Sequence, residues 1–261
     1  MSILVEVNDA RVHFGGIKAV DGVSLSLEEG RLYGLVGPNG SGKSTLIGVL
    51  SRLTDLTSGT LHFDGHEYEK LSPQRVARMG LGRTFQTVRL LPTLSVRENV
   101  MMGADVRTYG HRILPNWVMP RRTRRCEQFC RAAADSAIDR LELGRFAKHT
   151  PSELSYGVQR RVEIARVLAA APRIIFFDEP TAGMNREERD EIGSIMDQLR
   201  REGLTQVLVE HDMQMITDVC DHVYVMNLGK LIAEGDAVSV VQNPEVQAAY
   251  LGKSGRDHNV A

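Results

Sequence analysis

Short apolar segments separated by turn residues fill the first third of the chain. Residues 23–27 alternate apolar and polar side chains, which predicts a strand with one face toward solvent. Residues 32–36 are more continuously apolar, residues 43–53 have a helical pattern, and residues 61–63 precede a tight turn. This third of the chain therefore predicts strands that alternate with a helix.

The middle of the chain, residues 88–168, has a different pattern. It is rich in Arg and Ala, shows few strand patterns, and is interrupted by prolines at positions 92, 115, 120 and 151. We expect an inserted, mainly helical subdomain here. A basic cluster lies within it, made of Arg121, Arg122, Arg124 and Arg125. Two readings of this cluster stay open, namely a solvated helix start and a contact with lipid headgroups or a membrane partner.

Strand and helix patterns alternate again in the last third. Residues 173–177, 206–209 and 223–226 are apolar segments typical of buried strands. Residues 187–202 predict a helix whose apolar face carries Ile192, Ile195, Met196 and Leu199. Alternating strands and helices indicate an α/β fold with a mostly parallel sheet that is covered on both faces. We expect the N-terminal strands to form an antiparallel flap beside this sheet.

Charge and cysteine content narrow the class of protein. The 261 residues include 32 Lys and Arg against 33 Asp and Glu, a balance that argues against a nucleic-acid-binding protein. Cys126, Cys130 and Cys220 are too few and too oddly spaced for a disulfide framework or a zinc site, so we expect a reducing compartment. Cys126 and Cys130 lie one helical turn apart, and we expect them to be packing residues rather than ligands. No signal peptide is recognisable, and no apolar segment approaches the roughly 20 residues of a membrane span.

A glycine-rich segment carries the clearest chemistry. Residues 37–44 match G-x-x-x-x-G-K-[ST] between a predicted strand and a predicted helix. Its glycines let backbone N–H groups turn toward phosphate oxygens, and the helix start adds its positive end. Lys43 can reach the β- and γ-phosphates, and the Ser44 hydroxyl can ligate Mg²⁺. The predicted nucleotide contacts are Gly37, Pro38, Asn39, Gly40, Ser41, Gly42, Lys43, Ser44 and Thr45. By contrast, residues 80–85 lack a third glycine and predict a turn, not a dinucleotide site.

Two carboxylates follow the buried strand of the last third. Asp178 and Glu179 come directly after the apolar residues 174–177. The carboxyl ends of the strands form the edge of an open α/β sheet where ligands bind. We expect Asp178 to hold Mg²⁺, directly or through water, and Glu179 to orient and deprotonate the attacking water.

A third motif separates the candidate families. Residues 154–161 read Leu-Ser-Tyr-Gly-Val-Gln-Arg-Arg, which resembles the LSGGQ signature of ABC-type ATPases, with Tyr156 and Val158 as departures. A serine and a glycine N–H at a helix start make a further anion site. No N-K-x-D sequence is present, which disfavours a GTPase. The resemblance implies a P-loop NTPase (RecA-like) core, formed by residues 1–87 and 169–240. It also implies a helical subdomain at 88–168 and a C-terminal tail at 241–261.

Other elements of the ABC pattern occur in the expected order. Gln86 resembles the Q-loop glutamine, which contacts Mg²⁺ and water, and residues 182–185 resemble the D-loop, with Asn185 where Asp is commoner. His211 follows a predicted strand and resembles the switch histidine that contacts the γ-phosphate. Phe14 lies where this family usually places an aromatic ring against adenine, although another aromatic such as Phe63 could take that role.

In ABC ATPases the signature addresses the nucleotide of a second subunit. The resemblance therefore implies a head-to-tail dimer with two ATP molecules and Mg²⁺ between the subunits. Ser155, Gly157 and Gln159 would complete the site of the partner, and closure would depend on the γ-phosphate. Hydrolysis through Glu179, assisted by Lys43 and His211, would release that closure.

Several segments are similar to the ATPases of branched-chain amino acid importers, the LivG type. These are residues 14–16, 77–86, 88–100, Tyr156 with its neighbours, 182–185, and the ending at 248–252. The similarity implies a peripheral subunit on the cytoplasmic face of the inner membrane, with permease subunits as partners and a periplasmic solute-binding protein as an indirect one. Urea or amide importers and lipopolysaccharide exporters remain alternatives, and a non-transport regulator is the alternative of another class.

Overall fold

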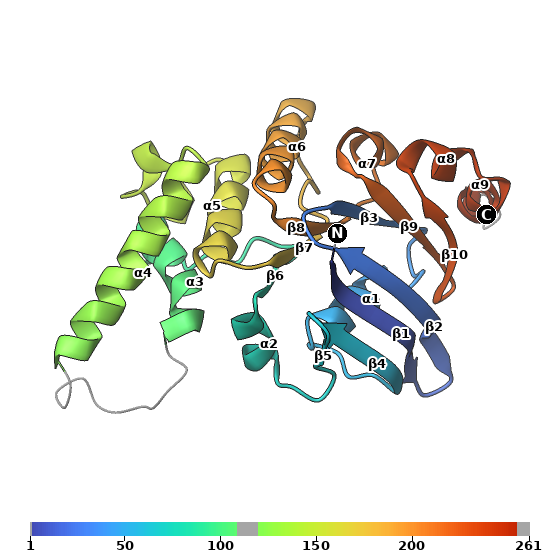
Figure 1. Ribbon diagram of the computed structural model, residues 1–261. Coiled ribbons are helices and arrows are strands. Elements are labelled where there is room, and N and C mark those ends of the chain that lie inside the picture. The colour runs from blue at the N-terminus through green and yellow to red at the C-terminus, as the bar shows by residue number, and fades with distance from the viewer. Residues whose placement is uncertain (1, 109–119, 255–261) are drawn as a thin grey trace.

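The computed structural model describes residues 2–108 and 120–254 (Figure 1). A six-stranded sheet runs through the molecule in the order β10 (Lys230–Gly235), β9 (His222–Asn227), β3 (Leu32–Val36), β8 (Thr205–Val209), β7 (Ile174–Asp178) and β6 (Leu81–Arg83). All its neighbouring strands pair in parallel except β10 with β9. The predicted mostly parallel α/β sheet is confirmed.

A second sheet, antiparallel, lies beside the first. Its order is β2 (Ile17–Glu28), β1 (Ile3–Phe14), β4 (Ser58–Phe63) and β5 (His66–Glu67). Residues 23–27, which alternate in sequence, form part of β2, and their apolar side chains are buried. The expected N-terminal antiparallel flap is therefore confirmed.

Strand β3 separates two hydrophobic cores because its side chains alternate between the faces of the sheet. Tyr33 and Leu35 pack toward the antiparallel sheet and α1 (Lys43–Leu50). Leu32 and Val36 belong to the other core, which includes residues of α6 (Arg186–Arg201) and α7 (Met213–Val219). The strand itself is completely buried, so its carboxyl end, and the loop that follows it, are firmly positioned.

The helical part lies at one end of the sheet, beyond β6 (Figure 1). Helices α3 (Val96–Thr108), α4 (Pro120–Arg140) and α5 (Tyr156–Ala169) pack against one another through apolar side chains such as Val100, Ile138 and Val162. These side chains continue into the core of the six-stranded sheet. Two short 3-10 turns, Gly144–Phe146 and Pro151–Glu153, connect α4 to α5.

Three further helices flank the two edge strands of the six-stranded sheet in the sequence. Helix α2 (Pro73–Met79) precedes β6, and α8 (Ala237–Gln242) and α9 (Pro244–Ser254) follow β10. In the described residues, 2–108 and 120–254, none of the helices combines the length and the apolar character that crossing a membrane requires.

Two local predictions need correction. The first helix ends at Leu50 rather than near residue 53, because Arg52 adopts a left-handed backbone with φ of 59°. Residues 80–85 were expected to form only a turn. Gly80, with φ of 108°, does end α2, but residues 81–83 then pair with β7 as an edge strand.

Of the basic cluster, Arg124 and Arg125 are exposed on α4, while the side chains of Arg121 and Arg122 lie outside the described set. Cys130 is buried in the apolar core, as a packing residue should be, and Cys126 is half-buried.

Candidate nucleotide site

Two glycines of the phosphate loop occupy positions where a side chain has no room. Gly37 and Gly42 have φ values of 146° and 105°. A Cβ on Gly37 would lie 2.1 Å from the carbonyl oxygen of Met226, and a Cβ on Gly42 would lie 2.2 Å from that of Ala19. The loop is therefore pressed against the β9–β10 hairpin and the start of β2, which hold its backbone in one shape.

Lys43 lies inside this loop at the N-terminus of α1. Its side-chain nitrogen donates to the carbonyl oxygens of Gly37 and Pro38, at 2.7 and 3.1 Å, and approaches the hydroxyl of Ser41 at 3.5 Å. Only 7% of the residue is exposed. A cation within a ring of backbone groups, at the positive end of a helix, is an arrangement that suits a polyphosphate.

A pocket of about 520 Å³ opens over the loop. Its lining is formed by Phe14, Ile17, Lys18, Ala19, residues 39–45, Glu179 and Leu228. The structure thus brings together the predicted adenine-stacking ring, most of the predicted phosphate contacts and the predicted base.

The wall of this pocket beside Phe14 is apolar and open to solvent. Phe14 is 56% exposed, and Ile17 and Leu228 are exposed as well. Leu228 has a positive φ of 48° in the turn between β9 and β10. Sequence reasoning did not include Ile17 or Leu228, because only the folded hairpin places them near the loop.

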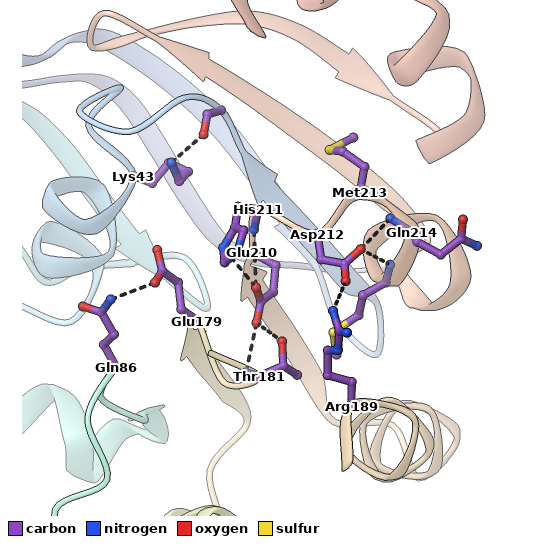
Figure 2. Close-up of polar contacts among 12 residues, drawn as sticks. Lys43, Gln86, Glu179, Thr181, Arg189, Glu210, His211, Asp212, Met213 and Gln214 are labelled. Atoms are coloured by element: carbon purple, nitrogen blue, oxygen red, sulfur yellow. Dashed lines mark hydrogen bonds and ion pairs between the residues drawn. The ribbon is translucent and has the colours of Figure 1, made fainter. Parts of the chain in front are cut away.

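Glu179 follows β7 in a left-handed backbone conformation, with φ of 45°. Its backbone N–H donates to the carbonyl oxygen of Val209 at 2.9 Å, which ties it to the end of β8. Its carboxylate accepts a hydrogen bond from the side-chain amide of Gln86 at 2.7 Å, and Figure 2 shows the two side chains pointing toward each other. A strained backbone held by neighbouring strands is common where side chains act on a ligand.

Asp178 lies one residue earlier and is 7% exposed. Its Oδ2 accepts a hydrogen bond from Arg83 at 2.9 Å, and the same arginine also donates to the hydroxyl of Ser51 at 3.1 Å. Arg83 was not among the predicted site residues, because nothing in its sequence position pointed to a residue 95 positions away.

The donor set suits magnesium bound together with a phosphate. Ser44, Gln86 and Asp178 offer oxygen atoms, the ligands that Mg²⁺ prefers. The amide nitrogen of Gln86 is engaged with Glu179, so its amide oxygen faces away from that bond. Residues 2–108 and 120–254 contain no cluster of three or more His, Cys, Asp or Glu that could hold a metal by itself.

His211 lies on the loop after β8 with 66% of its side chain exposed. Its Nδ1 is 3.6 Å from the carboxylate of Glu210, whose backbone neighbour it is (Figure 2). Glu210 is buried and accepts hydrogen bonds from the backbone N–H and the hydroxyl of Thr181, at 3.0 and 2.6 Å. Glu210, which sequence reasoning missed, thus joins the His211 loop to the segment after Glu179.

The signature residues lie outside the pocket. Ser155 is exposed at the N-cap of α5, where its side chain accepts from the N–H of Val158 at 3.5 Å. The amide nitrogen of Gln159 donates to the carbonyl oxygens of Pro151 and Leu154, at 3.0 and 3.1 Å. Both hydrogens of that amide are then used within its own segment. Of the described residues that line the pocket, none comes from the signature.

The predicted D-loop ends in a helix cap. Asn185 accepts from the N–H of Glu188 at 2.9 Å, and Glu188 accepts in return from the N–H of Asn185 at 3.1 Å. This reciprocal pair begins α6. An asparagine in place of the commoner aspartate therefore fulfils the same local role.

The sequence matches two family models. Residues 20–182 match the ABC transporter family, and residues 230–255 match the branched-chain amino acid ATP-binding cassette transporter family. Among curated proteins, the branched-chain amino acid transport ATP-binding proteins BraF of Pseudomonas aeruginosa and LivG of Escherichia coli are each 36% identical over 252 residues. Those alignments cover 96% of this chain and 98% of each relative.

The fold of this chain is also similar to solved structures of ATP-binding cassettes. A nucleotide-free ATP-binding cassette from an ABC transporter superposes with a TM-score of 0.84 at 30% identity, over 97% of this chain and 100% of that one. A dimeric cassette in a post-hydrolysis state, bound to ADP and Pi, superposes with a TM-score of 0.72 at 27% identity, over 90% of this chain and 99% of that one.

The chain is therefore an ATP-binding cassette and belongs to the ABC transporter family. Within that family it is an ATPase subunit of a transporter, similar along nearly its whole length to BraF and LivG.

Proposed function

We propose that this chain supplies ATP hydrolysis to an importer of branched-chain or other hydrophobic amino acids. One observation carries the proposal: the similarity to BraF and LivG extends over 96% of the chain. It includes the C-terminal residues 230–255, which lie beyond the ABC motifs and match the branched-chain amino acid cassette family. A similarity limited to the nucleotide site would support only a generic ATPase.

The site residues divide the reaction among themselves. Lys43 and the N–H groups of residues 39–45 hold the β- and γ-phosphates, and Phe14 stacks on adenine. Ser44 and Asp178, with Gln86, hold Mg²⁺, which when bound neutralises charge on the phosphate oxygens. The pocket lined by Phe14, residues 39–45 and Glu179 supports the nucleotide contacts. Asp178 precedes Glu179 in the chain and Gln86 donates a hydrogen bond to it, which supports their part in holding Mg²⁺.

Glu179 acts as the base. It takes a proton from the water that attacks the γ-phosphate, and the amide of Gln86 orients its carboxylate through the 2.7 Å hydrogen bond. His211 acts from the end of β8 as a second contact to the γ-phosphate. The side chain of His211 is exposed and lies next to the carboxylate of Glu210, which supports a loop whose conformation changes when nucleotide binds.

A second cassette completes each site. Ser155 and Gly157, with Gln159 in support, address the nucleotide of the partner subunit, because Ser155 is exposed and lies outside the pocket of its own chain. The dimeric relative bound to ADP and Pi supports this arrangement. For a chain of the LivG type we expect a related second cassette rather than a second copy.

The other partners follow from the transporter class. The cassette works as a nucleotide-binding core, residues 1–87 and 169–240, with a helical subdomain at 88–168 and a tail at 241–261. It docks on permease subunits at the cytoplasmic face of the inner membrane and acts indirectly on a periplasmic solute-binding protein. The transported solute is recognised by those partners and not by this chain.

Reconstitution tests the proposal. The chain would be assembled with the permeases, second cassette and binding protein encoded beside it, and ATP hydrolysis and uptake into vesicles would be measured with leucine, glutamine and urea. We expect leucine, with its binding protein, to raise ATP hydrolysis and to accumulate. The Glu179→Gln transporter is the matched control that should do neither. Stimulation of ATP hydrolysis by urea alone would contradict the proposal and would assign the chain to a urea importer.

A further inference from the structure

One buried cation connects the signature helix to the site of its own chain. Arg160 lies on α5, five residues after Ser155, and its side chain is fully buried. Its guanidinium donates to the carbonyl oxygens of Phe85 at 2.7 Å and Gln86 at 2.9 Å, and approaches that of Glu179 at 3.3 Å. The backbone of both partners in the Gln86–Glu179 hydrogen bond is thus held by one side chain of the signature helix.

The charge of this arginine is balanced within the same element. Arg160 donates to the carboxylate of Glu163 at 2.5 Å, and Glu163 is also completely buried. The other oxygen of Glu163 lies 3.4 Å from the N–H of Phe85 and 3.8 Å from Arg166. Burial raises the pKa of Glu163, against the lowering effect of Arg160. Loss of either member of the pair therefore leaves the charge of the other buried without its partner.

The shape of the guanidinium makes the connection stiff. Its N–H groups point in fixed directions in one plane, so carbonyl oxygens that it engages keep fixed relative positions. A shift of α5 therefore moves the backbone of residues 85–86 and residue 179 together. Because the carbonyl group and the side chain of Glu179 are attached to the same Cα, a shift of that carbonyl also changes the direction of the side chain.

We propose that Arg160 is a positioning residue that sets the geometry of the Gln86–Glu179 pair according to the position of the signature helix. The inference rests on the proposed roles of Ser155 and Glu179. When Ser155 engages the nucleotide of the partner subunit, Arg160 carries that displacement to the base of its own site. Occupancy of one nucleotide site then sets the turnover rate of the other, which is a coupling between sites.

The test compares substitutions at two arginines of the helical part, Arg160 on α5 and Arg131 on α4, in the complete transporter. Arg160→Gln keeps a hydrogen-bond donor but removes the charge and the planar guanidinium. Arg160→Lys keeps the positive charge, but its single nitrogen can reach fewer carbonyl oxygens. Arg131→Gln is the control, because Arg131 lies on the exposed surface of α4, outside the signature, and pairs only with Glu127 of its own helix at 3.5 Å among the described ion pairs. For each variant we would measure ATP affinity with a fluorescent analogue, kcat, and the Hill coefficient for ATP.

We expect Arg160→Gln to keep ATP affinity within about twofold, to lower kcat at least about tenfold, and to bring the Hill coefficient toward one. Arg160→Lys should recover part of kcat, and Arg131→Gln should match the wild type. An unchanged kcat and Hill coefficient in Arg160→Gln would overturn the proposal. A loss of ATP affinity, kcat and thermal stability in equal measure would also overturn it, because that pattern is the one for a merely structural residue.

Two further variants separate a failure to fold, and a failure of the proposed dimer function, from a failure of this inference. Arg160→Met combined with Glu163→Gln removes both buried charges, so this double variant should fold even if Arg160→Gln fails to fold. We expect it to show the same loss of kcat. In a Glu179→Gln background, Arg160→Gln should still form the ATP-dependent dimer. Absence of any such dimer in Glu179→Gln alone would count against the proposed dimer function, whereas normal turnover in the Arg160 variants counts only against this inference.

Discussion

The phosphate loop and the signature segment are both glycine-containing turns at the start of a helix, but they differ in how the rest of the chain surrounds them. The loop is closed by its own chain: Gly37 and Gly42 are pressed against carbonyl oxygens of β9 and β2, and Lys43 is buried among backbone groups. The signature has Ser155 exposed, and the amide of Gln159 is turned toward its own turn.

The difference teaches where each segment finds its ligand. A loop that is backed by neighbouring strands and lined by Phe14 and Glu179 forms a nucleotide site within one chain. An exposed helix start with no part in that pocket is suited to a ligand brought by another molecule. Changes in the loop should therefore act on one subunit alone, and changes in the signature should act only in the dimer.

The largest expected effect is at the proposed base. Glu179→Gln removes the proton acceptor but preserves the shape of the side chain, so we expect ATP to bind and kcat to fall by about 10²- to 10⁴-fold. The closed dimer should accumulate with ATP, as seen by size-exclusion chromatography. Glu245→Gln, an exposed change in α9, is the control and should leave turnover normal. Normal turnover in Glu179→Gln would remove Glu179 from the role of base.

The next effect is at the loop itself. Lys43→Ala removes a charged hydrogen-bond donor to phosphate, worth about 1.5–3 kcal/mol, so the Kd for ATP should rise about 10- to 100-fold. Titration calorimetry on the single subunit measures this, with Lys230→Ala as the control because Lys230 is exposed and outside the pocket. An unchanged Kd would contradict the assignment of the loop.

A smaller effect is expected at the signature, and only in the dimer. Ser155→Ala removes an N-cap, costing about 1 kcal/mol of folding free energy, and should leave the ATP affinity of the single subunit unchanged. Turnover of the dimer should fall about fivefold or more, because a hydrogen bond to the nucleotide of the partner is lost. Asp236→Ala removes the N-cap of α8 and is the control for stability. Equal loss of turnover in both variants would indicate a stability effect alone.

The smallest effect concerns adenine. Phe14→Ala removes a stacking ring worth about 0.5–1.5 kcal/mol, so the Kd for ATP should rise about 2- to 10-fold, and Phe14→Tyr should restore it. Phe129→Ala is the control, since Phe129 is 46% exposed and lies away from this pocket. If Phe14→Ala binds ATP like the wild type, Phe14 does not stack on adenine.

Much of the fold followed from local patterns, and the exceptions have physical reasons. Buried strands such as residues 174–178 are continuous apolar segments, so their pattern is sufficient. The strand at 81–83 has only three residues and forms because β7 offers a pairing edge. The first helix stops early because of a backbone turn at Arg52, for which an arginine gives no sequence signal.

By itself, the sequence determined the phosphate loop, the acidic pair after β7 and the signature, because each is a contiguous segment whose chemistry lies in its own backbone and side chains. Only the tertiary structure decided which residues surround them. Arg83 meets Asp178 across 95 residues, and Arg160 meets Phe85 and Gln86 across 75 and 74. Such contacts depend on which strands and helices lie side by side, and buried charges are stable only where folding brings a partner within reach.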